Sequence, residues 1–131
     1  MRIGIAAIIV ALTLGACGAA AAPRSGATPR IIAIQANDQM KFSPATVTAQ
    51  PGETILFKVT NVGKAVHEFM VGPKEAVDAD GPDGTAEIED IRAGQTKELL
   101  YTFADAGTYA FACHEVGHFE AGMVGAIALL P

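Results

Sequence analysis

The sequence predicts an all-β protein, an antiparallel β-sandwich of seven to eight short strands. Short runs rich in β-branched and aromatic residues recur along the chain, and apolar and polar residues alternate within them, as in half-buried strands. Turns containing glycine or proline separate these runs. Residues 30–131 are predicted to fold as one domain, and about 100 residues is typical of a β-sandwich domain.

Residues 1–17 have the pattern of an export signal. Arg2 supplies the positive start, and the apolar run 3–14 is shorter than the roughly 20 residues that span a bilayer. The sequence LGAC, which ends at Cys17, resembles a bacterial lipobox, whose cysteine becomes the lipidated N-terminus. An ordinary signal cleaved among residues 19–22 is the alternative. Both place the mature protein in the periplasm or on the outer surface of the cytoplasmic membrane, and a lipidated Cys17 would be its membrane tether.

Residues 18–29 are small, include proline and lack periodicity, so they are predicted to form a flexible linker. The formal net charge of the chain is −5. This charge argues against nucleic acid as a partner and against polybasic binding to anionic lipid.

The predicted strands follow one another with little helix between them. They cover residues 30–37, 45–50, 53–61, 65–72, 96–104, 107–113 and 123–130. One short helical turn is expected over residues 73–79.

The segment 75–90 contains seven acidic residues and no basic residue. Part of it resembles an EF-hand loop, but Pro82 and Asp83 stand where a ligand and a glycine are required. We therefore expect a solvated acidic loop rather than a calcium site. A docking patch for a basic partner is the alternative.

The chain has only two cysteines, and Cys17 belongs to the signal or the anchor, so Cys113 has no disulfide partner. A lone thiol in an oxidising compartment is expected to be buried or to bind a metal. Alternation along the strands places Cys113 on the same inward face as Phe111, and His67 on the same inward face as Phe69. Met70 lies on the opposite face from His67 and is a poor candidate ligand.

The segment CHEVGHFEAGM joins Cys113 to His118 and Met123, with a glycine just before each of the last two. Glycine permits the tight turns that would fold such a loop around one ion. A thiolate, two imidazoles and a thioether suit copper, because a trigonal His₂Cys set with a weak axial methionine is the blue-copper site. Zinc would gain little from the thioether.

The pattern Cys-x4-His-x4-Met with an upstream histidine resembles the cupredoxin family of small blue copper proteins. Its loop length is more similar to the rusticyanin and auracyanin type than to plastocyanin. The stretches FSPATVTAQPGETILFKVTN and DAGTYAFAC resemble cupredoxin strands. The resemblance implies a Greek-key sandwich and one type 1 copper ion, with His67, Cys113, His118 and Met123 as its ligands.

Two residues depart from the usual cupredoxin pattern. Glu68 follows the first histidine, where many relatives have a small polar residue whose backbone N–H approaches the cysteine sulfur. Glu68 can still supply this N–H, and its carboxylate can instead fix a neighbouring loop. His114 is predicted to leave the strand face that Cys113 uses, although adjacent histidines bind further coppers in multicopper oxidases.

The resemblance implies a monomer that carries single electrons between redox partners, such as a cytochrome or an oxidase, by Cu(I)/Cu(II) cycling. His118 would be the electron port, within an apolar patch that includes Val116 and Phe119. The alternative is a periplasmic copper-binding protein for copper tolerance, storage or delivery, although His-rich or Met-rich tracts are missing from the mature sequence. An enzyme is not expected, because only His114 would remain for additional coppers.

Overall fold

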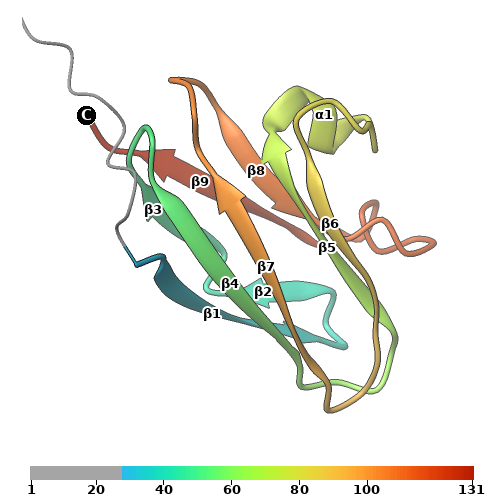
Figure 1. The fold of residues 1–131 in the computed structure, drawn as a ribbon. Helices are drawn as coiled ribbons and strands as arrows, with labels where there is room; N and C mark the ends of the chain where they lie inside the picture. The colour runs from blue at the N-terminus through green and yellow to red at the C-terminus, as the bar shows by residue number, and fades with distance from the viewer. Residues whose placement is uncertain (1–27) are drawn as a thin grey trace, which may run out of the picture.

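Two β-sheets pack face to face in the structure, a computed structural model that describes residues 28–131 (Figure 1). The predicted β-sandwich is confirmed. The predicted export signal 1–17, with Cys17, lies outside the described residues, as does nearly all of the predicted linker 18–29. Among the described residues, no helix has the length and apolarity needed to cross a membrane.

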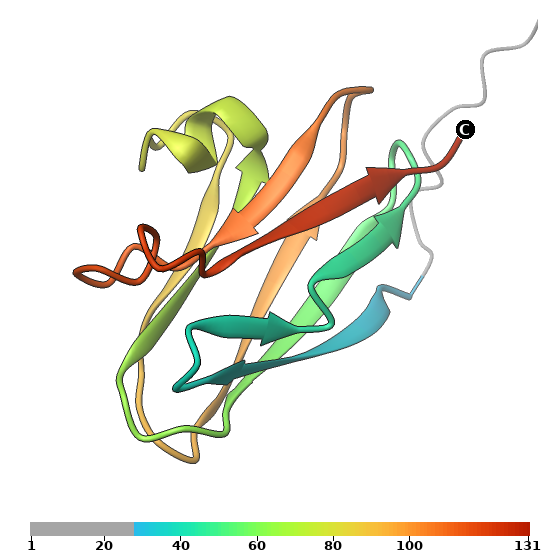
Figure 2. The same cartoon turned by 180° about the vertical axis from the view of Figure 1, so that it is seen from behind.

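The first sheet has the strand order β2-β1-β4-β7, and the second has the order β3-β9-β8-β5-β6. The first comprises β1 (Arg30–Asn37), β2 (Lys41–Ser43), β4 (Thr54–Asn61) and β7 (Thr96–Thr102). The second comprises β3 (Thr46–Ala49), β5 (His67–Pro73), β6 (Ala86–Ile91), β8 (Tyr109–Ala112) and β9 (Val124–Leu129). The one helix of the described chain, α1 (Lys74–Asp78), lies where the short helical turn was expected, and it packs near β5 and β8 (Figure 2).

Strand direction and strand number differ in part from the prediction. β1 pairs with β4 in parallel and β3 pairs with β9 in parallel, whereas the other pairings are antiparallel. The described residues form nine strands, because β2 and β6 were not expected. β6 corrects the prediction of an entirely solvated acidic loop over 75–90: Ile88 and Ile91 face the core, while the side chains between them remain exposed.

The core between the sheets consists of the inward residues that alternation predicts. Ile55, Phe57 and Val59 of β4 are fully buried. The ring of Phe69 packs 5.2 Å from that of Phe57 and 5.3 Å from that of Phe111, measured between centroids. Phe69 lies two residues after His67 on β5, and Phe111 lies two residues before Cys113 at the end of β8. Their aromatic packing therefore fixes the strand ends that carry the candidate metal site.

Candidate metal centre

The pairing of β5 with β8 brings His67 and Cys113 together. The strands are antiparallel, with Met70 opposite Ala112, so the start of β5 lies beside the end of β8. His67 begins β5, and Cys113 follows the last residue of β8. The backbone N–H of Glu68 donates a hydrogen bond to the Cys113 Sγ at 3.4 Å.

The loop after β8 places His118 at the same point. His118 Nδ1 lies 3.3 Å from Cys113 Sγ, and the rings of His67 and His118 are 5.0 Å apart between centroids. One potential donor atom from each of these three residues lies within 4.8 Å of the other two. Gly117 adopts a φ of +82°, which glycine tolerates, and the His118 N–H donates to the carbonyl of Glu115 at 2.8 Å.

Met123 ends this loop and is tied to both neighbouring candidates through its backbone. Its N–H donates to the carbonyl of His118 at 3.0 Å, and its carbonyl accepts from the N–H of Cys113 at 3.1 Å. The Met123 side chain is fully buried in the same core cluster as Cys113. The two ends of the loop, Cys113 and Met123, are therefore held together, and the thioether of Met123 is buried in the core.

The buried donors fit a metal ion. Both ring nitrogens of fully buried His67 lack hydrogen-bond partners within residues 28–131, and leaving a buried polar group without a partner costs free energy. Burial raises the pKa of the Cys113 thiol to about 11. Burial, and then the charge of His118, lowers the pKa of His67 and keeps its imidazole neutral. At neutral pH the thiolate is therefore favoured only when a cation beside it compensates its charge. The two imidazole nitrogens, the thiolate sulfur and the thioether suit copper.

A model of copper binding proteins of the plastocyanin/azurin family matches residues 30–130 of the chain. The chain belongs to this family. Copper is therefore the cofactor of this fold.

Two curated relatives are each named "Copper-resistant cuproprotein CopI". The chain is 35% identical over 109 residues to the protein from Rubrivivax gelatinosus, covering 76% of this chain and 66% of that protein. It is 33% identical over 110 residues to the protein from Vibrio cholerae serotype O1, covering 76% and 65% respectively. The match thus spans just under two thirds of the length of either relative.

The fold is also similar to that of dithionite-reduced auracyanin from Roseiflexus castenholzii. The TM-score is 0.65, and the match covers 81% of this chain and 100% of that one. The sequence identity is 21%, so this likeness concerns the fold.

In this plastocyanin/azurin-family site, Glu68 makes both of the contacts that were considered for it from the sequence, one through its backbone and one through its carboxylate. Its backbone N–H reaches the Cys113 sulfur, and its carboxylate accepts a hydrogen bond from the backbone N–H of His114 at 2.5 Å. Glu68 thereby joins the two strand ends that carry His67 and Cys113. Met70 lies on the other face of β5, packed with Val77, as alternation predicted.

Sequence reasoning missed Asn61, which holds the turn that leads into His67. Asn61 is fully buried, and its Nδ2 donates to the carbonyls of Ala65 at 2.6 Å and Ile91 at 2.8 Å. Its Oδ1 accepts from the N–H of Gly63 at 2.8 Å. One signal was available, because Asn61 is a polar residue that continues the inward face of β4.

Replacing Asn61 with alanine is expected to lower the free energy of unfolding by about 3 kcal/mol, because three backbone groups lose their buried partner. Urea denaturation of the metal-free protein measures this change. Asn37→Ala is the matched control. Within residues 28–131 the Asn37 side chain accepts a single, exposed hydrogen bond from the N–H of Gln39, so a cost below about 1 kcal/mol is expected. Equal effects of the two substitutions would contradict the role assigned to Asn61.

Proposed function

We propose that this copper protein carries single electrons outside the cytoplasm, with His67, Cys113, His118 and Met123 as the ligands of one type 1 copper ion. The observation that carries the proposal is the convergence of three donor side chains, which the fold holds within 4.8 Å of one another. Copper bound there would supply the Cu(I)/Cu(II) couple. The export pattern of residues 1–17 supports a location outside the cytoplasm.

The surroundings of the donors favour one fixed ligand geometry. Cys113 and Met123 are joined by a backbone hydrogen bond, and Glu68 ties the sulfur to β5. Rigid ligands suit electron transfer because the same arrangement then serves both oxidation states. Four protein donors would leave no open position for a substrate, so we propose a carrier rather than an enzyme.

The partly exposed ring of His118 is the proposed electron port. Val116, in the same loop, is 98% exposed, and Phe119 is partly exposed beside it. An apolar rim around a buried redox site fits brief docking of a redox protein, such as a cytochrome or an oxidase, with the carrier acting as a monomer.

Placing a charge at this rim should slow electron exchange without altering the metal site. We expect Val116→Asp to lower the rate of electron exchange with cytochrome c by about tenfold or more, because the desolvated contact would bury an unpaired carboxylate. Stopped-flow absorbance of the copper-loaded protein measures the rate, with an unchanged visible spectrum as the check. Leu100→Asp, at a 56% exposed position on β7, is the control and should leave the rate unchanged. Equal slowing by both variants would contradict docking at the His118 edge.

The names of the two CopI relatives favour a second candidate, a role in copper tolerance. One experiment separates the two functions: the copper-loaded protein is mixed with reduced cytochrome c and, separately, with a strong Cu(I) chelator. A carrier exchanges electrons rapidly and retains its copper, whereas a storage or delivery protein releases copper and exchanges electrons slowly.

A further inference from the structure

A second cluster of metal-binding side chains lies on the outer side of the candidate copper site. It consists of Glu68, Asp80 and His114, whose potential donor atoms all lie within 4.8 Å of one another. His114 Nδ1 is 3.2 Å from Glu68 Oε1 and 3.6 Å from Asp80 Oδ1. The copper site leaves His114 without a role, and its side chain lies beside Glu68, away from the face that Cys113 uses.

The His114 side chain is nine-tenths buried, yet neither of its ring nitrogens has a hydrogen-bond partner within the described part of the chain. Its ring stacks on Phe119, with centroids 4.9 Å apart and planes inclined by 18°. An unpaired buried imidazole is costly, and water does not reach its nitrogens. The Nδ1 atom nevertheless lies within 3.6 Å of an oxygen of each of two carboxylates without forming a hydrogen bond to either, and a cation between them would satisfy all three groups.

The spacing of these donors suits a small divalent ion. Zinc binds nitrogen and carboxylate oxygen at about 2.0–2.2 Å, so two tetrahedral ligands lie about 3.4 Å apart. The separations of 3.2 Å and 3.6 Å fall on either side of that value. Both separations from His114 are therefore close to those of a binding geometry before any ion enters.

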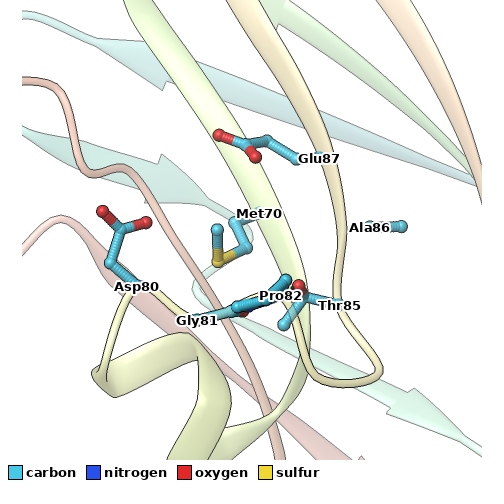
Figure 3. A pocket seen from close by; sticks show the side chains of 7 residues that line it. All are labelled: Met70, Asp80, Gly81, Pro82, Thr85, Ala86 and Glu87. Atoms are coloured by element: carbon cyan, nitrogen blue, oxygen red, sulfur yellow. Dashed lines mark hydrogen bonds between the residues drawn. The ribbon is translucent and has the colours of Figure 1, made fainter.

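A pocket borders the cluster at Asp80 and has room for an ion and water. Figure 3 shows the pocket lined by Asp80 and Glu87, with the thioether of Met70 between them. Its volume of about 280 Å³ holds a cation with several waters, since each water takes about 30 Å³ in the liquid. Negative charge accumulates here: partial burial, and then the charges of Glu68, Glu89 and Asp80, raise the pKa of Glu87.

We propose that Glu68, Asp80 and His114 form a second metal site, which binds one divalent cation of the Zn²⁺ or Cu²⁺ class next to the type 1 site. One imidazole with two carboxylates suits these ions, whereas Ca²⁺ and Mg²⁺ prefer oxygen ligands alone. The backbone of Glu68 touches the Cys113 sulfur, so the two sites share one residue. The second site does not depend on whether the first carries electrons.

Titration of the copper-loaded protein with Zn²⁺ tests the proposal. We expect about one Zn²⁺ to bind while copper is retained, as measured by calorimetry and by metal analysis after gel filtration. Asp80→Asn and His114→Gln should each weaken this binding by at least about tenfold, since loss of even an outer-sphere partner costs that much. Asp80 is 61% exposed, so its substitution should preserve the fold.

Asp83→Asn is the matched control, because Asp83 belongs to the same acidic segment but lies outside the cluster. This variant should bind Zn²⁺ with the affinity of the parent. Absence of Zn²⁺ binding by the parent would overturn the second site. It would also be overturned if Asp83→Asn weakened Zn²⁺ binding as much as the other two substitutions, because the acidic segment as a whole would then attract the cation. Equal affinity of all variants would overturn it too. The visible absorption of the same samples reports separately on the type 1 copper site. A failure of the proposed type 1 site is therefore distinguishable from a failure of the second metal site.

Discussion

Replacing Cys113 with serine is expected to abolish the intense visible absorption of the copper-loaded protein. That absorption arises from charge transfer between a thiolate and Cu(II), and Cys113 supplies the thiol at the cluster of donors. A serine hydroxyl is a hard donor that stays protonated at neutral pH, so it cannot take over this bond. The measurement is the visible spectrum after loading with one equivalent of Cu²⁺, with the bound copper quantified in the same sample.

Cys17→Ser is the matched control for this substitution, because Cys17 is the other cysteine of the chain. It should retain the full absorption of the parent. An intense band that survives in Cys113→Ser would contradict the proposed ligand set. A parent that retains copper but stays colourless would place the copper at a different site. Thermal unfolding of the metal-free forms distinguishes loss of the ligand from loss of the fold.

Much of this fold was predictable because each long strand keeps an apolar inward face. β4 illustrates the signal, since Ile55, Phe57 and Val59 alternate with partly exposed residues. β2 has only three residues, and β6 is an edge strand with acidic outward side chains, so neither produces a clear alternation. The parallel pairings were also hidden, because side chains alternate identically in parallel and antiparallel strands.

The candidate copper site was more predictable than its surroundings. Alternation placed His67 and Cys113 inward, and the spacing of His118 predicted a loop that returns to the sulfur. The contact between Asp80 and His114 could not be foreseen, because it depends on the path of the chain after α1. The tasks of Glu68 likewise depend on the antiparallel pairing of β5 with β8.

Gly125→Ala is expected to destabilise the metal-free protein by about 3 kcal/mol or more, because the core has no room for the added methyl group. Gly125 pairs with Phe111 across β8 and β9. A Cβ on Gly125 would lie 2.1 Å from the Cζ and 2.2 Å from the Cε2 of Phe111. The Phe111 ring is fully buried against Phe42 and Phe69, so it cannot move aside without displacing its neighbours.

The same displacement should reach the metal site, since Phe111 precedes Cys113 by two residues on one strand face. We therefore expect Gly125→Ala to weaken copper binding as well, and Phe111→Leu combined with it to recover part of the lost stability by vacating the space that the methyl group needs. Urea denaturation measures the stability, and Gly107→Ala is the control. The added Cβ there comes no closer than 3.7 Å to Tyr109, so the change should stay within about 1 kcal/mol. Parent-like stability of Gly125→Ala would show that the aromatic core yields more easily than its burial implies.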